Sequence, residues 1–379
     1  MLKRLYADNF KCLVNFEITV DLINLFLGSN GSGKSAIFEA LRKLTGFVAG
    51  RGKVSDLFAL SDCTRWQDSC IQSLELDIER EAGVYRYELA IEHSREEVKA
   101  RVQHERLWFN NGPLMKFESF DKQEFHPEVQ LFRDDHSTGP RYPFDWSLSA
   151  LASIFPRRDN TLLTWFKKRL KQVIVVQPVP LLMREDSAEE ESQPSAHLEN
   201  YTSWYRSLSQ DQGVSYQLTA ALREVMPEFD RFVFEQLGED HRLLKVYLRD
   251  AEGPGSFGYR FGELSDGQRT LIALYTLLAA GRADESEGYT LCLDEPENFL
   301  ALPEIQPWLS TLYGICNGGG LQALLISHHP ELINYLLASP IGRWFDRESN
   351  RPTRVRTISP DERSGLPISE LIARGWLRE

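Results

Sequence analysis

Cysteine is scarce in this sequence, and its spacing excludes two kinds of stabilising site. Five cysteines occur among 379 residues, and none belongs to a C-x-x-C pair: Cys12, Cys63, Cys70, Cys292 and Cys316. Disulfide frameworks and Cys-rich zinc sites depend on regularly spaced cysteines. The sequence therefore predicts reduced thiols in a cytoplasmic protein, with neither a disulfide frame nor a zinc site.

Long apolar runs and an excess of positive charge are also missing. No apolar run approaches the roughly 20 residues that cross a bilayer, so no membrane span is predicted. The opening MLKRLYADNFKCLV has a basic pair, but Asp8 and Asn9 stand where a signal peptide would have an apolar core. The net charge is −12, whereas proteins held on nucleic acid by charge alone are usually basic. Any DNA contact is therefore expected from a local patch, an assembled state or a partner chain.

The chain is long enough for a large core, and its character changes twice along its length. Residues 1–105 are predicted to be an antiparallel β subdomain around one helix, from alternating runs such as SLELDIERE and VYRYELAIEH and a helical run from Gly33 to Leu44. Residues 106–258 are predicted to be a mainly helical inserted lobe with an exposed, mobile acidic loop at 184–197. Residues 259–379 return to α/β, because YTLCLDEP and LQALLISHH are typical of parallel strands buried on both faces. No internal repeat and no sustained heptad pattern is present.

The stretch GSNGSGKS fits the phosphate-binding pattern G-x-x-x-x-G-K-[ST] in full. It follows an apolar strand at 23–27 and opens an amphipathic helix, which is the context that the pattern requires. The glycines let the loop turn its N–H groups toward phosphates, Lys34 is expected to reach the β- and γ-phosphates, and the Ser35 hydroxyl to bind Mg²⁺. The expected nucleotide contacts are Gly28, Ser29, Asn30, Gly31, Ser32, Gly33, Lys34, Ser35 and Ala36.

Two further motifs follow apolar strands. In TLCLDEP, Asp294 is predicted to hold the Mg²⁺ shell and Glu295 to polarise the attacking water, provided that the strand breaks at Pro296. In LLISHHPE, Ser327 and His328 are expected at the γ-phosphate, with His329 facing away or supporting the turn. A purely structural histidine is the competing interpretation for His328.

The stretch GELSDGQRTL lies before a helix whose apolar residues share one face. Ser265 and Gln268 form the S-x-x-Q pattern of a capping box, which satisfies helix N–H groups. A capped helix start with Gly267 close by is also an anion site. The two interpretations are compatible.

Together, GSNGSGKS, LSDGQR, LCLDEPENFL and ISHHPE resemble the Walker A, signature, Walker B with D-loop, and switch-histidine motifs of ABC-type ATPases. The opening LYADNFKCLVNFEI and the run DEPENFLALPEIQPWL are more narrowly similar to the SMC/RecF/OLD branch, including OLD-like AAA-family ATPases. The resemblance covers residues 1–50 and 260–340 well. It implies an α/β P-loop NTPase fold, an ABC-ATPase head with an antiparallel β subdomain and an inserted helical lobe.

The resemblance also implies the ligands and the assembly. ATP and Mg²⁺ would be bound in a homodimer, with Ser265, Gly267 and Gln268 acting in trans on the nucleotide held by the other subunit. Lys11, in an NFK-like turn, would approach the nucleotide. The Q-loop glutamine is either Gln123 or Gln177. Asp266 stands where glycine is more usual, which adds negative charge near phosphate.

The spacing of these motifs separates related families. Ser265 follows Ser35 by 230 residues, whereas in transporter ATPases roughly a hundred residues separate the signature from the phosphate loop. SMC proteins have a coiled coil in this interval, and no such heptad pattern is present here. The 50 residues after His329 are too few for the TOPRIM domain of OLD nucleases. A cytoplasmic Mg²⁺-ATPase is predicted that dimerises on ATP as a switch, in DNA-related genome maintenance or anti-phage defence, with a separately encoded effector such as a nuclease.

The alternative function is a regulatory scaffold that holds a partner inactive with little turnover and no DNA binding.

Two basic stretches are candidate DNA contacts or solvated faces: TWFKKRLK, with Lys167, Lys168, Arg169 and Lys171, and RESNRPTRVR near the end.

Overall fold

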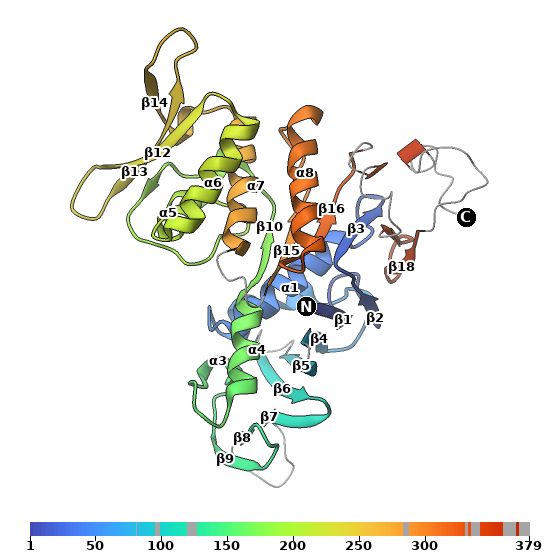
Figure 1. The fold of residues 1–379 in the computed structure, drawn as a ribbon. Helices are drawn as coiled ribbons and strands as arrows, with labels where there is room; N and C mark the ends of the chain where they lie inside the picture. The colour runs from blue at the N-terminus through green and yellow to red at the C-terminus, as the bar shows by residue number, and fades with distance from the viewer. Residues whose placement is uncertain are drawn as a thin grey trace. The chain divides into compact units, whose positions relative to one another are not determined.

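The computed structural model describes residues 1–80, 82–94, 99–119, 127–282, 288–329, 333–334, 342–358 and 369–370. The chain divides into two compact units (Figure 1). The first comprises Met1–Val173 with Ile341–Ile358, and the second comprises Ile174–Pro340 with Ser359–Glu379. Each unit therefore combines segments that are far apart in the sequence.

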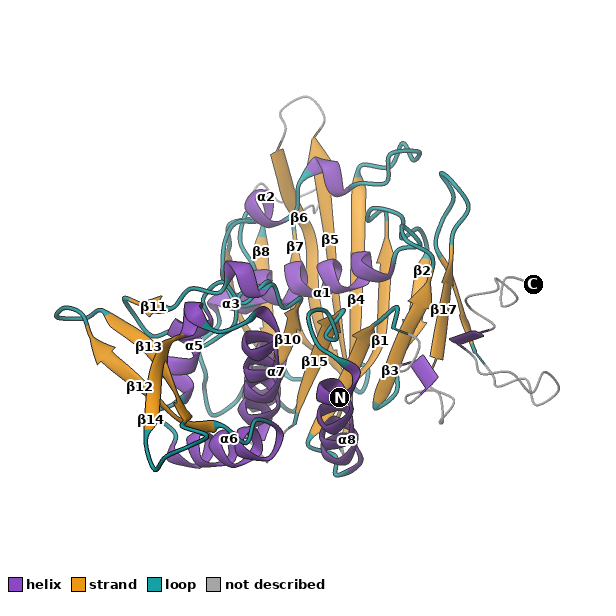
Figure 2. Ribbon diagram, turned by 90° about the horizontal axis from the view of Figure 1, so that it is seen from above, coloured by secondary structure: helices purple, strands orange, loops and turns teal. Residues whose placement is uncertain are grey.

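An eight-stranded antiparallel sheet dominates the first unit (Figure 2). Its order is β2-β1-β4-β5-β6-β7-β8-β9. The predicted pairing of the runs SLELDIERE and VYRYELAIEH is confirmed as β4 and β5. The strands are β1 (Leu2–Asp8), β2 (Phe16–Thr19), β4 (Ile71–Arg80), β5 (Gly83–Ser94), β6 (Lys99–Phe109), β7 (Gly112–Glu118), β8 (Glu128–Phe132) and β9 (Thr138–Pro143).

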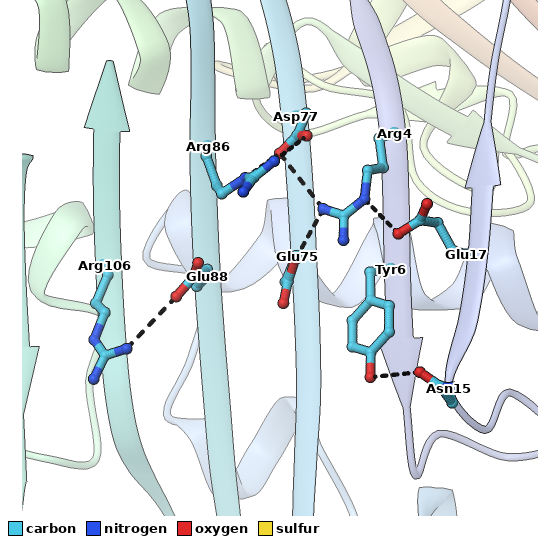
Figure 3. A network of polar contacts seen from close by, with 9 residues as sticks. All are labelled: Arg4, Tyr6, Asn15, Glu17, Glu75, Asp77, Arg86, Glu88 and Arg106. Carbon is cyan, nitrogen blue, oxygen red and sulfur yellow. Dashed lines mark hydrogen bonds and ion pairs between the residues drawn. The ribbon is translucent and has the colours of Figure 1, made fainter. Parts of the chain in front are cut away.

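One face of this sheet is apolar, and the other carries a ladder of charges. Alternate side chains such as Leu76 and Tyr87 are fully buried, as the period of two along a strand requires. On the opposite face, Arg4 donates to Glu17 at 2.7 Å and to Glu75 at 2.8 Å. Figure 3 shows how this ladder crosses from β2 to β6.

Asp77 is the most buried carboxylate of the ladder, with its side chain 10% exposed. It receives two hydrogen bonds from Arg86, both 3.0 Å long, and lies 3.6 Å from Arg4. Farther along, Arg106 lies 3.6 Å from Glu88 (Figure 3). Opposite charges on neighbouring strands support this pairing of the strands.

A second set of strands in the first unit positions the glycine-rich loop. β3 (Ile23–Gly28) is buried along its whole length and runs parallel to β17 (Gly342–Asp346), which pairs antiparallel with β18 (Arg354–Thr357). The helix predicted from Gly33 to Leu44 is confirmed as α1 (Lys34–Val48), and most of its side chains are buried. Residues 342–358 thus join the N-terminal strands.

Short helices complete the first unit: α2 (Val54–Leu57), α3 (Ala150–Ser153) and α4 (Thr161–Lys171), with a 3-10 turn at Leu60–Asp62. α1 contacts all three helices. Glu105 of β6 is completely buried and accepts from Ser149 Oγ at 2.7 Å and from the Ala150 amide at 2.7 Å. Burial has the largest effect on the pKa of Glu105 and raises it, and the hydrogen bonds to the carboxylate partly offset this rise.

In the second unit, parallel strands lead to the sequence motifs. β15 (Tyr289–Asp294) and β16 (Leu321–Ile326) pair in parallel, as predicted from their continuous apolar runs. β10 (Val173–Val176) lies on the other side of β15. α7 (Asp266–Arg282) contacts α8 (Leu302–Asn317), and the Trp308 indole of α8 donates to the Leu274 carbonyl at 3.1 Å.

The rest of the second unit combines two helices with a small antiparallel sheet. α5 (Tyr201–Leu208) contacts α7, and α6 (Gln212–Val225) contacts both α7 and β12 (Figure 1). The sheet consists of β11 (Asp186–Ser187), β12 (Phe229–Gln236), β13 (Arg242–Arg249) and β14 (Ser256–Arg260), and 3-10 turns occur at Pro180–Leu182 and Phe261–Glu263. Tyr205 of α5 packs its ring against Phe232 of β12, with the ring centroids 4.6 Å apart.

The structure differs from the sequence prediction between residues 106 and 258. Strands β7–β9 and β12–β14 occur there beside the helices, so the segment is not mainly helical. The acidic stretch 184–197 is only partly exposed, because β11 pairs with β13 and the Ala196 carbonyl accepts from the Gln177 amide at 2.8 Å. The predicted domain boundaries stay a prediction. Among the described residues, no helix has both the length and the apolar character to cross a membrane.

Candidate nucleotide-binding motifs

The glycine-rich loop has the backbone that its sequence predicts. Gly28, Gly31 and Gly33 all have positive φ, at +144°, +77° and +104°. A Cβ on Gly28 would lie 2.2 Å from the Phe345 carbonyl oxygen, and one on Gly33 would lie 2.4 Å from Thr353 Oγ1. Both the conformation and the close packing therefore require glycine.

The side chains of the loop divide into buried and exposed groups. Ser29, Asn30, Gly31 and Ser35 are exposed, whereas Ser32, Lys34 and Ala36 are buried. Lys34 Nζ donates to the carbonyl of Gly28 at 2.8 Å and to that of Ser29 at 3.0 Å. The Lys34 ammonium group thus lies over the loop whose bound phosphates it is predicted to contact.

The loop fits a bound phosphate. α1 begins after Gly33 with no capping side chain and no acidic residue in its first turn, so its partial positive charge is not neutralised within the helix. The exposed Ser35 hydroxyl offers an oxygen ligand of the kind that Mg²⁺ prefers. No group of three or more His, Cys, Asp or Glu side chains suited to a metal occurs among the described residues.

Lys11 lies in a turn next to this loop. It has a φ of +53°, and its amide donates to the Asp62 carbonyl at 2.6 Å. Its ammonium pairs with Glu39 of α1. In this structure the Lys11 side chain is therefore directed at the helix, and its predicted contact with nucleotide stays a prediction.

In the second unit, the acidic pair lies where β15 ends. Asp294 is the last residue of the strand, and Glu295 has a φ of +50°. The expected break therefore comes at Glu295 itself, one residue before Pro296. The Glu295 amide still donates to the Ile326 carbonyl of β16 at 2.9 Å, which fixes the turn. Because the strand ends at Asp294, the side chains of Asp294 and Glu295 need not point to opposite faces of the sheet, as neighbouring side chains within a strand do.

Glu295 and His328 face each other within this unit. Glu295 Oε1 lies 3.9 Å from His328 Nε2, and Glu295 Oε2 accepts from the Asn298 amide group at 2.8 Å. Both Glu295 and His328 are partly exposed, with 33% and 42% of their side chains accessible. The imidazole is thus placed beside the carboxylate that is predicted to polarise water.

Glu297 is a residue that sequence analysis missed. It is 8% exposed, and its Oε1 accepts from the Ser327 hydroxyl and from the His328 amide, the latter at 3.3 Å. Burial raises the pKa of Glu297, and these hydrogen bonds partly offset the effect. The Ser327 hydroxyl also accepts from the His329 amide at 3.1 Å. Glu297 thereby ties the turn after β15 to the turn after β16.

The start of α7 contains the predicted capping box. Ser265 Oγ accepts from the backbone amide of Gln268 at 3.2 Å, and Gln268 Oε1 accepts from the backbone amide of Ser265 at 3.1 Å. A Cβ on Gly267 would lie 2.9 Å from the Phe299 carbonyl oxygen, so this glycine packs against the D-loop of its own unit. The capping box is confirmed, and a role in trans stays a prediction.

The unusual Asp266 of the signature is paired. It accepts from Arg269, whose other amino group donates to the Pro180 carbonyl at 2.8 Å. Arg269 is 9% exposed. The negative charge that Asp266 adds to this helix start is therefore offset by a neighbouring cation.

Other predicted residues lie apart from these groups. Gln177 follows β10, and Gln123 lies outside the described residues, so the Q-loop assignment stays open. In TWFKKRLK, Arg169 is 1% exposed, and Lys167 donates to the carbonyls of Ala152 and Ile154 at 2.9 and 2.6 Å. Only Lys168 and Lys171 of that stretch are exposed. The predicted basic patch is thus half the size that the sequence indicated.

Comparison with known proteins agrees with these motifs. Residues 23–334 match the family model described as "AAA domain, putative AbiEii toxin, Type IV TA system". No curated protein shows a significant match. An SmcHead structure bound to the C-winged helix domain of ScpA is similar over 96% of this chain and 99% of its own, with 12% identity and a TM-score of 0.58. An SMC head domain from Thermotoga maritima covers 94% and 99%, with 15% identity and a TM-score of 0.46.

The first of these structures shows that the fold is that of an SMC-head P-loop NTPase. The family match spans most of the chain and includes the glycine-rich loop, the signature, the acidic pair and the histidine turn. The chain therefore belongs to the AAA domain family, and membership of this family implies an ATPase that binds ATP.

Proposed function

We propose that this protein hydrolyses ATP with Mg²⁺, dimerises around the nucleotide and acts as a switch for a separately encoded effector. The observation that carries the catalytic part is the position of Glu295. It stands at positive φ directly after a buried strand, with its carboxylate 3.9 Å from the His328 imidazole.

Each residue has a distinct task in this proposal. ATP and Mg²⁺ supply the scissile phosphoanhydride and neutralise its charge when bound. Lys34 and the loop amides hold the β- and γ-phosphates, and Ser35 with Asp294 would hold the metal. Glu295 orients the attacking water and accepts its proton, while His328 donates to the γ-phosphate oxygens.

The dimer is proposed from the exposed signature start. Ser265 is exposed, and its capping box leaves the turn accessible from solvent. A closed two-fold pairing would bring each Ser265 turn to the nucleotide of the other subunit. A DNA-related role in genome maintenance or anti-phage defence rests on the resemblance to the SMC/RecF/OLD branch and on the exposed Lys168 and Lys171.

The first experiment uses Glu295→Gln, which should bind ATP, lose turnover and accumulate as a dimer in size-exclusion chromatography with light scattering. Glu304→Gln is the matched control, because Glu304 is an exposed carboxylate on the same stretch of chain. Monomers only, in the presence of ATP, would contradict the proposed assembly. ATP binding without turnover by the wild-type protein, with or without DNA, would support the scaffold function instead.

The second experiment tests the role of Ser265 in trans. Ser265→Arg and Lys34→Ala proteins should each be inactive, and mixing them should restore up to about a quarter of wild-type turnover, because half of the randomly formed dimers contain one intact site. A mixture that remains inactive would indicate that Ser265 acts within its own subunit.

A further inference from the structure

The carbonyl groups of the phosphate loop receive hydrogen bonds from a distant part of the chain. Arg347 Nη1 donates to the Gly31 carbonyl at 3.1 Å, and Thr353 Oγ1 donates to the Ser32 carbonyl at 2.9 Å. These donors come 316 and 321 residues after the groups to which they donate. The glycine-rich motif alone therefore does not determine the conformation of the loop.

Both donors are themselves held in place. The Arg347 guanidinium lies over the Trp66 ring, 5.1 Å from its centroid, and Arg347 Nε donates to the Arg351 carbonyl at 3.0 Å. Thr353 is 4% exposed, and its amide donates to the Cys12 carbonyl at 3.0 Å. Because these anchors lie outside the loop, the two donors resist movement of the loop instead of following it.

The direction of a carbonyl determines the direction of the next amide. In a planar trans peptide, the C=O and N–H bonds point to opposite sides. The Ser32 carbonyl shares its peptide with the Gly33 amide, so a carbonyl held toward Thr353 turns that N–H to the other side. The N–H groups of such a loop are the groups that bind phosphate.

We propose that Thr353 and Arg347 are positioning residues of the nucleotide site, which keep the carbonyls of Gly31 and Ser32 turned away from bound phosphate. This inference rests on the proposed ATP binding and names residues that no motif assigns to it. Without Thr353, the Ser32 carbonyl loses a buried donor and becomes free to turn toward the anion, where its negative end would repel phosphate.

The test compares Thr353→Val with Thr353→Ser, using a fluorescent mant-ATP probe with Mg²⁺. The valine variant keeps the shape and loses the donor, so its Kd is expected to rise about tenfold, the effect of one lost hydrogen bond to a buried acceptor. The serine variant keeps the hydroxyl and should bind within about twofold of the wild type. In steady-state turnover, KM should rise in the valine variant while kcat stays nearly unchanged.

Two controls complete the design. Thr357→Val makes the same change at an exposed position of β18 and should leave mant-ATP binding unaltered. Arg347→Met removes the second donor independently and should also weaken binding, which keeps the test valid if Thr353→Val does not fold. Folding is checked by thermal unfolding of every variant.

The outcomes distinguish the possible failures. Equal binding by the wild type, Thr353→Val and Arg347→Met would overturn this inference while leaving ATP binding intact. Equal weakening by Thr353→Val and Thr353→Ser would also overturn it, because packing and not the hydroxyl would then be responsible. Absence of mant-ATP binding by the folded wild-type protein would instead contradict the proposed function.

Discussion

Replacement of Glu297 should damage both the stability of the protein and its turnover. In Glu297→Ala, the Ser327 hydroxyl and the His328 amide both lose the carboxylate oxygen that accepts from them. An unsatisfied buried donor lowers the free energy of unfolding by about 1–3 kcal/mol. Removal of the poorly solvated carboxylate offsets part of this loss, because burial of a charged group is itself unfavourable. We expect the free energy of unfolding to fall by about 2–4 kcal/mol.

Glu297→Gln separates the acceptor from the charge. Its amide oxygen can still accept from both donors, so its stability should lie within about 1 kcal/mol of the wild type at neutral pH. Burial raises the pKa of Glu297 in the folded protein. The stability linked to its protonated form is therefore present at low pH and is lost as pH rises through the folded pKa. Relative to Glu297→Gln, the wild type should become less stable as pH increases above the ordinary range of a glutamate.

The assays are urea unfolding across pH and steady-state ATP turnover. Glu297→Ala should lower kcat about tenfold with KM for ATP nearly unchanged, because the turn that carries His328 moves while the phosphate loop does not. Glu304→Ala is the control: it removes an exposed carboxylate that accepts from the Ala301 amide at 2.8 Å, and it should lower the free energy of unfolding by less than about 1 kcal/mol. Wild-type stability and kcat in Glu297→Ala would refute this reasoning, as would equal damage in Glu297→Gln.

Two predictions concern the large sheet. Asp77→Ala should lower the free energy of unfolding by about 1–3 kcal/mol in urea titrations, because Arg86 and Arg4 lose a buried partner. Glu17→Ala, at a side chain 53% exposed, is the control and should cost less than about 1 kcal/mol. Equal effects would show that burial does not determine how much these ion pairs contribute to stability. Burial lowers the pKa of His104 to about 4, so its contribution to stability is complete above the ordinary histidine pKa and is lost as pH falls toward 4. His104→Gln should reduce the loss of stability between pH 7 and pH 5, and an unchanged loss would show that other groups cause it.

Local patterns predicted the elements that carry the motifs. β3, α1, β15 and β16 have uniform burial or clear helical periodicity, so a short window of sequence was sufficient. The carboxyl ends of the two parallel strands placed Glu295 and His328 in neighbouring turns, as the pattern indicated.

The later strands were missed for physical reasons. β6 interrupts its apolar alternation with the buried Glu105, and its register with β5 shifts between Ala90 and Ile91. β14 exposes Phe257 and Tyr259 at 60% and 41%, so its pattern does not separate a buried face from a solvated one. Such strands depend on pairing with distant neighbours, which a local window does not contain.

The positioning residues could not be predicted from sequence either. Glu297 stands in an acidic run that is typical of a solvated turn, yet Ser327 and His328 enclose it. Arg347 and Thr353 lie in RESNRPTRVR, a basic stretch whose composition makes it a candidate DNA contact or a solvated face. Nothing near them in the sequence indicates that they reach a loop more than 300 positions earlier.

The long separation between Ser32 and Thr353 has a consequence for biosynthesis. A ribosome releases the glycine-rich segment early, but the hydroxyl that holds it emerges 321 residues later. Nucleotide should therefore bind the nascent N-terminal strands more weakly than the finished chain, because the loop lacks this donor until translation is nearly complete. A stalled or truncated product ending before Arg347 would lack both donors and should therefore bind ATP more weakly than the full-length chain.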